Sequence, residues 1–95
     1  MKTTFTITTT TEAQKATKLI LKNINLIARI IFSETARGNT RVRFTNLTGD
    51  YEITYDLHDH NWFTVMEKII NLDWEDEEDI EGEMLVFFNP NYKEF

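Results

Sequence analysis

The sequence contains no cysteine, a single proline and three glycines in 95 residues. Without cysteine the chain forms no disulfide and offers no thiolate ligand for zinc. No apolar run approaches the roughly 20 residues of a membrane-spanning helix, and no positively charged start leads into an apolar signal segment. There is also no internal repeat and no linker rich in proline, glycine or serine. We therefore expect a single domain over residues 1–95, located in the cytoplasm and unprocessed.

The apolar content is sufficient for a folded core. Hydrophobic residues make up 41% of the chain, and they include seven phenylalanines, three tyrosines and two tryptophans. A chain of this length buries only roughly 60–65% of the surface that it exposes when unfolded, so its stability margin is thin. This composition nevertheless argues against disorder of the whole chain.

Charge is distributed unevenly along the chain. Residues 1–48 carry eight lysines and arginines against two acids, a net charge of +6, whereas residues 49–95 carry two lysines against fourteen acids, a net charge of −12. Such asymmetry predicts separate basic and acidic faces, or partial neutralisation of one half by the other within the fold. Because the total is −6, an acidic surplus remains in either case.

The first half begins with an alternating segment and continues into an amphipathic one. Apolar residues alternate with threonines over residues 3–9, which predicts an edge strand with one apolar face. The TEAQ motif at residues 11–14 has the form of a capping box, with its threonine as the N-cap. Polar residues then recur at helical spacing as far as Ser33, so we expect one continuous helix. The rival interpretation ends the helix near Asn23 and makes residues 26–32 a strand, because this segment is rich in β-branched isoleucine.

Two alternating segments in the middle of the chain predict a β-hairpin. The segments RVRF (residues 41–44) and YEITYDL (residues 51–57) alternate polar and apolar side chains, and a glycine-containing turn joins them. Asp59 or Asn61 is then placed to cap a second helix that runs to Leu72. Large apolar residues of this helix recur at helical spacing, which is typical of core packing. They are Trp62, Phe63, Met66, Ile69 and Ile70.

The apolar run MLVFF at residues 84–88 predicts a buried strand. The order is then strand, helix, strand, strand, helix, acidic segment, strand. This order predicts an α+β fold, a mostly antiparallel sheet with two helices on one face. The βαββαβ order also fits a ferredoxin-like topology.

The most unusual feature is the acidic segment, residues 73–83, which reads DWEDEEDIEGE and holds eight acids and no base. Its charges would be about 1.9 Å apart along a helix axis and about 4 Å apart in an extended chain, so either form imitates the phosphate spacing of a nucleic acid. In a helix, repulsion between acids three and four residues apart would cost roughly 2–4 kcal/mol. We interpret this cost as evidence for binding, with Ile80 and Trp74 as anchors to the rest of the fold. The candidate partner-binding residues are Asp73, Trp74, Glu75, Asp76, Glu77, Glu78, Asp79, Glu81 and Glu83.

Two further groups of residues offer other chemistry. His58 and His60, beside Asp56 and Asp59, have the spacing of metal ligands, although a loop before a helix is the ordinary explanation. No nucleophile motif or glycine-rich phosphate loop accompanies them, and the acidic segment lacks the alternating ligands and central glycine of a calcium loop. The bases between residues 15 and 43 offer contacts to phosphates, but the net negative charge opposes nucleic-acid binding. We therefore expect no catalysis, metal, cofactor, membrane contact or direct nucleic-acid binding, and we assign the basic side chains to packing or to a homodimer.

Several short motifs resemble those of small phage anti-CRISPR proteins, which inhibit an RNA-guided DNA-cleaving nuclease by mimicking DNA. They are RFTNLTG (residues 43–49), DYEI (residues 50–53), VMEKII (residues 65–70) and Trp74 followed by EDEE (residues 75–78), and they cover less than half of the chain. The resemblance implies that the acids occupy the basic groove with which the nuclease reads the protospacer-adjacent duplex. It extends to Glu75, Asp76, Glu77, Glu78 and Asp79.

Two functions of the acidic segment follow. In the first, the chain is a phage-type inhibitor that acts in the host cytoplasm and blocks a basic, DNA-binding surface of a host defence (CRISPR) nuclease. In the second, it is an immunity protein or antitoxin that neutralises a basic toxin. Both use the same surface, so the sequence leaves the partner open.

Overall fold

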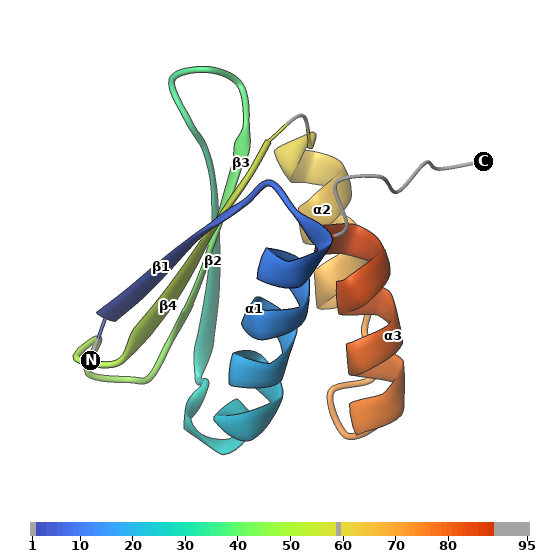
Figure 1. Cartoon of the computed structure of the whole chain (residues 1–95). Helices are drawn as coiled ribbons and strands as arrows, with labels where there is room; N and C mark the ends of the chain where they lie inside the picture. Colours follow the sequence, from blue (N-terminus) through green and yellow to red (C-terminus); the bar gives the residue numbers. More distant parts are fainter. Residues whose placement is uncertain (1, 59, 89–95) are drawn as a thin grey trace.

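The computed structural model describes residues 2–58 and 60–88 (Figure 1). The strands are β1 (Lys2–Ile7), β2 (Arg29–Glu34), β3 (Thr40–Thr45) and β4 (Glu52–Leu57). The helices are α1 (Thr10–Lys22), α2 (Trp62–Ile70) and α3 (Glu77–Phe88), and a short 3-10 helix, η1 (Ile24–Leu26), follows α1.

The four strands form one sheet in the order β1-β4-β3-β2. β3 pairs antiparallel with β4 on one side and with β2 on the other, which confirms the predicted hairpin. β1 lies at the edge, as expected, but runs parallel to β4, with Phe5 opposite Tyr55. The sheet is therefore mixed and mostly antiparallel, and the α+β class is confirmed.

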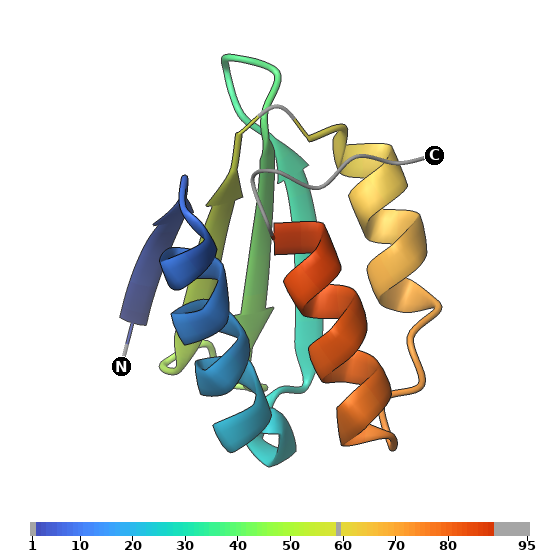
Figure 2. The ribbon, with the colours of Figure 1, turned by 45° about the vertical axis from the view of Figure 1, so that its right-hand side comes forward.

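All three helices lie on one face of the sheet, and the opposite face carries no described helix (Figures 1 and 2). α1 and α3 pack side by side, and α2 lies over β2 and β3. Tyr55 is fully buried between the layers, where its ring centroid lies 5.6 Å from that of Phe5 and 5.5 Å from that of Phe44. Its hydroxyl donates a 2.9 Å hydrogen bond to the carbonyl of Ala16, which ties α1 to the central strand.

The predicted continuous helix over residues 11–33 is wrong, and the rival interpretation is confirmed. α1 ends at Lys22 because Asn23 closes it: the side-chain amide of Asn23 donates to the Leu19 carbonyl at 3.0 Å, and its backbone N–H reaches the Leu19 and Ile20 carbonyls. The isoleucine-rich segment that follows becomes β2 and pairs with β3. Arg29 therefore lies on a strand and is separated from the lysines of α1.

The start of α1 also differs from the expectation. Thr9 is the N-cap, and its hydroxyl accepts a 3.1 Å hydrogen bond from the backbone N–H of Glu12, so the predicted cap at Thr11 is wrong. At α2 the cap is Asn61, as predicted, whereas Asp59 lies outside the described residues. The expected core packing of α2 is confirmed for Ile69, and Val65, which was not among the expected core residues, is buried as well.

Two apolar residues of α2 face outward. Phe63 and Ile70, seven positions apart and so on one side of the helix, are 55% and 57% exposed. Their assignment to the core is wrong. An exposed aromatic residue and an exposed isoleucine are ordinary on a protein surface, and they lie opposite the side that packs on the sheet.

The predicted strand at residues 84–88 is wrong as well, because α3 continues through Phe88. A short apolar run fits a buried strand and a helix equally, and the helix that begins at Glu77 extends through it. With β2 added and this strand absent, the element order departs from βαββαβ. Within the described residues, α1, α2 and α3 lie on one face of the sheet, where two helices were expected.

Candidate functional site

The acidic segment consists of a turn followed by the first part of α3. Asp76 is the N-cap of this helix: its Oδ1 accepts hydrogen bonds from the backbone N–H groups of Glu78 and Asp79, at 3.1 and 3.2 Å. Before it, Asp73 Oδ1 accepts from the N–H of Glu75 at 3.2 Å. Asp79 Oδ2 in turn accepts from the N–H of Asp73 at 3.3 Å. The three aspartates therefore hold the shape of the turn.

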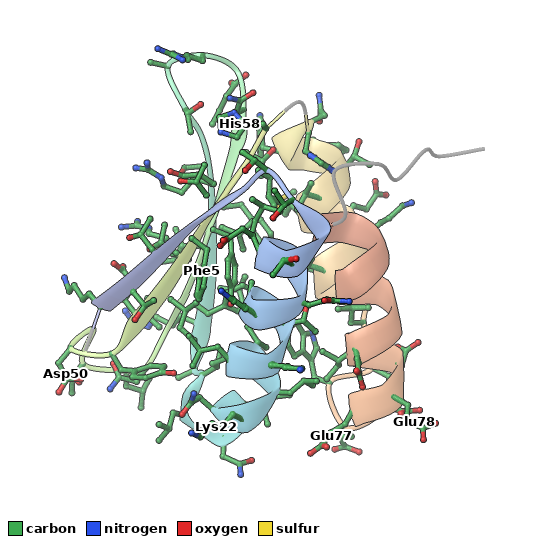
Figure 3. All side chains as sticks on the ribbon, in the orientation of Figure 1. Phe5, Lys22, Asp50, His58, Glu77 and Glu78 are labelled. Atoms are coloured by element: carbon green, nitrogen blue, oxygen red, sulfur yellow. The ribbon has the colours of Figure 1, made fainter. Side chains whose placement is uncertain are left out.

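The glutamates of the segment have a different role. We call Glu75, Glu77, Glu78 and Glu81 the glutamate group. All four are exposed, and within the part of the chain that the structure describes their carboxylates make no hydrogen bond and no ion pair. Figure 3 shows Glu77 and Glu78 at the outer end of α3, pointing away from the body of the protein. Their charges are free to meet a partner.

Two apolar side chains anchor the acidic segment, as predicted. Ile80 is fully buried one turn into α3. Trp74 is partly buried against the core; its ring centroid lies 6.3 Å from that of Phe44, and its Nε1–H donates to the carbonyl of Ile69 at 3.2 Å. The segment is thus a fixed surface, and Trp74 contributes to it mainly as an anchor.

The two arginines of β3 pair with acids of β4. Arg41 donates to both carboxylate oxygens of Asp56, at 2.7 and 3.0 Å, and these bonds raise the pKa of its guanidinium. Arg43 Nη1 lies 3.7 Å from Glu52 Oε1. Both pairs join β3 to β4 on the sheet face away from the helices. Successive residues of a strand point to opposite faces, and the alternate residues, such as Val42, are buried on the face that the helices cover. The two halves of the chain therefore neutralise each other partly, through β4 and not through the acidic segment.

One base of α1 lies toward the acidic segment. Lys22 lies at the same end of the molecule as Glu77 and Glu78 (Figure 3). Among the described residues, however, no lysine or arginine nitrogen comes within 4.0 Å of a carboxylate of Asp73 to Glu81. The negative charge of the segment is uncompensated by any direct ion pair in that part of the chain.

The repulsion predicted for the acidic segment is smaller than the sequence indicates. Because the helix begins only at Glu77, the pairs that involve Asp73 and Glu75 are not at helical spacing. The pairs 77/81, 78/81 and 79/83 remain, at roughly 0.2–0.5 kcal/mol each. Acids in the first turn also gain about 0.3–1 kcal/mol each from the helix dipole. The expected repulsive cost of roughly 2–4 kcal/mol is therefore wrong, and the exposure of the carboxylates is the better indication of a binding surface.

Glu83 and the two histidines are the remaining candidate residues. The side chain of Glu83 lies outside the described part of α3, so its role as a binding residue stays a prediction. His58 and His60 are held by local bonds: His58 Nδ1 lies 3.1 Å from the side-chain nitrogen of Asn39, and His60 Nδ1 lies 2.6 Å from the His58 carbonyl. Among the described residues no group of three or more histidines, aspartates and glutamates is arranged to hold a metal ion.

The sequence patterns did not predict that the aspartates bond to the backbone of the turn while the glutamates remain exposed and unpaired. A signal for it exists, because aspartate is a preferred N-cap residue and glutamate is not.

Comparison with protein-family models, with curated proteins and with solved structures found no significant match to this chain. No helix within the described residues is both long and apolar enough to cross a bilayer.

Proposed function

We propose that the chain is a phage-type inhibitor that binds a basic, DNA-binding surface of a host defence nuclease of the RNA-guided class. The observation that carries the proposal is the exposed and unpaired glutamate group on a rigid support. Glu77, Glu78, Asp79 and Glu81 place four charges within about 6 Å of helix axis, at 1.5 Å per residue. That charge density is comparable with the ~1.7 Å spacing of duplex phosphates. The resemblance of residues 43–83 to anti-CRISPR proteins supports this class of partner.

The partner surface is expected to be rich in arginine and lysine. Exposed charges act over the Debye length, about 8 Å at physiological ionic strength, so association should be faster at low salt and weaker at high salt. The acids would occupy the groove that otherwise accepts the DNA backbone. Inhibition would therefore be competitive with target DNA and would need no chemical step by the chain.

The test is DNA cleavage by a panel of guide-loaded, RNA-guided nucleases, measured with and without the purified chain. We expect at least one nuclease to be inhibited and to recover as target DNA is raised. The variant Glu75→Gln/Glu77→Gln/Glu78→Gln should inhibit about tenfold less, since three exposed ion pairs at roughly 0.5 kcal/mol each amount to that factor. The matched control Glu12→Gln/Glu34→Gln/Glu67→Gln removes the same charge from other elements and should inhibit normally.

Two results would overturn the proposal. If the triple variant of the acidic segment inhibits as well as the wild-type chain, the glutamate group is not the binding surface. If no nuclease of the panel is bound or inhibited while a basic toxin is neutralised, the immunity function replaces it.

A further inference from the structure

A hollow of about 290 Å³ opens beside the acidic segment. It lies where η1 leads into β2, and Trp74 forms its wall on the side of the acidic segment. Most of its lining is apolar. The lining residues are Ile24, Asn25, Ile27, Ala28, Arg29, Ile30 and Trp74.

The walls of the hollow are well fixed. Ile30 pairs opposite Phe44 in the sheet, and the backbone N–H of Ala28 donates to the Thr45 carbonyl at 2.8 Å. The indole of Trp74 has its N–H bonded to the Ile69 carbonyl, so the part of the ring that faces the hollow is apolar. A rigid apolar recess is what an incoming side chain needs.

We propose that this hollow receives an apolar side chain from the same basic partner that binds the glutamate group. The inference rests on the proposed function, and it adds an apolar anchor to the charged contact. Its volume is just below the roughly 300–1,000 Å³ of small-molecule pockets, which suits a single leucine, methionine or phenylalanine side chain. Protein interfaces commonly combine one buried anchor with a charged rim.

Charge complementarity fixes the chemistry of the occupant. Trp74 lies between Asp73 and Glu75 in the chain, and both are exposed, so acidic residues adjoin the wall that Trp74 forms; we call them the acidic rim. Arg29 is a cation among the lining residues. A segment that places lysine or arginine next to an apolar residue would satisfy the acidic rim and fill the hollow together. A wholly hydrophilic polycation would bind the rim only.

The test compares two short lysine-rich peptides, identical except that one has leucine at its centre and the other has serine. Binding is followed on the full chain by NMR, through the indole N–H of Trp74 and the methyl groups of Ile24, Ile27 and Ile30. The leucine peptide should bind roughly tenfold or more tightly, as expected when one aliphatic side chain is buried. It alone should shift the isoleucine methyl resonances.

A matched pair of variants localises the effect. Ala28→Phe places a ring over the hollow from an exposed lining position and should abolish the preference for leucine. Ala36→Phe, also at an exposed alanine but in the turn between β2 and β3, should retain it.

Failure of the inference is distinguishable from failure of the proposed function. Suppose that both peptides bind with equal affinity and that the Glu75→Gln/Glu77→Gln/Glu78→Gln variant binds neither. This result would overturn the apolar anchor but would still support the acidic surface as the binding site. Retention of the leucine preference in Ala28→Phe would also overturn the anchor. Absence of binding by either peptide at low salt would overturn both.

Discussion

The carboxylate of Asp79 accepts a 3.3 Å hydrogen bond from the backbone N–H of Asp73, which joins the first residue of the acidic segment to the first turn of α3. Two acids six positions apart are thereby held close together, although their charges repel. The bond is possible because Asp79 satisfies a backbone donor instead of facing another carboxylate. The charge density of this surface therefore depends on the turn, which brings the acids together, as well as on the number of acids in the sequence.

The N-cap of α3 gives the first prediction. Asp76→Ala removes the acceptor for the N–H groups of Glu78 and Asp79 and should lower the free energy of unfolding by about 0.5–2 kcal/mol. Asp76→Asn keeps a capping oxygen and should cost much less. Urea unfolding followed by circular dichroism measures both. Equal stability of the two variants would show that Asp76 is not the cap.

The charges of α3 give the second prediction. Glu81→Gln removes the repulsion with Glu77 and Glu78 and should stabilise the fold by roughly 0.4–1 kcal/mol. Glu77→Gln relieves one repulsion but loses a favourable interaction with the helix dipole, so its effect should be close to zero. The comparison is made by thermal unfolding at low salt, and the gain from Glu81→Gln should shrink in high salt. A destabilised Glu81→Gln variant would contradict this balance.

Trp74 gives the third prediction, which separates packing from hydrogen bonding. Trp74→Phe keeps an aromatic ring near Phe44 but loses the bond to the Ile69 carbonyl, and should cost about 0.5–1.5 kcal/mol. The carbonyl retains the N–H of Leu72 as a donor. Trp74→Ala also removes the packing and should cost about 3 kcal/mol, the lower end for a large aromatic residue, because Trp74 is only partly buried. If both variants lose equal stability, the ring does not anchor the segment.

Tyr55 gives the fourth prediction, on pH. Burial raises the pKa of its hydroxyl well above that of an unfolded tyrosine, about 10. A group whose pKa is raised on folding stabilises the fold fully below the unfolded pKa and loses this contribution as pH rises above it. Stability should therefore fall above about pH 10 in the wild-type chain. Urea midpoints on either side of that pH give the slope.

The control for this prediction is Tyr55→Phe, which cannot ionise at this position. It should be less stable by about 0.5–1.5 kcal/mol at neutral pH, because the bond to Ala16 is lost. Its stability should decline less steeply at alkaline pH, although Tyr51, whose pKa burial also raises, still contributes. A slope as steep as that of the wild-type chain would exclude Tyr55 as the responsible group.

Sequence patterns predicted the parts of the fold that depend on neighbours in the chain. The alternation in β1, β3 and β4 and the cap at Asn61 are local signals, and each was confirmed. The prediction for the residues of β2 was wrong because the polar spacing of α1 continues through them. The residues that continue it are Lys22, Asn25, Arg29 and Ser33. This segment forms a strand because it pairs with β3, and a pattern of neighbouring residues does not contain that contact.

The candidate site shows the same limit. Composition located the acidic segment, and the anchoring by Trp74 and Ile80 was expected from their apolar character. The first residue of α3 could not be placed, so the repulsion between acids was overestimated. The hollow beside Trp74 brings together η1, β2 and the turn before α3, which are about 45 positions apart in the sequence. Only the tertiary fold reveals it.

The parallel pairing of β1 with β4 has a consequence for how the chain reaches its native state. Lys2 pairs with Glu52 and Ile7 with Leu57, so this contact closes a loop of fifty positions, whereas short turns join β2, β3 and β4. Loop closure is entropically costly and slows the formation of non-local contacts. We therefore expect the meander β2–β3–β4 to form early and β1 to join the sheet last, so that mutations in β1 accelerate unfolding more than they slow folding.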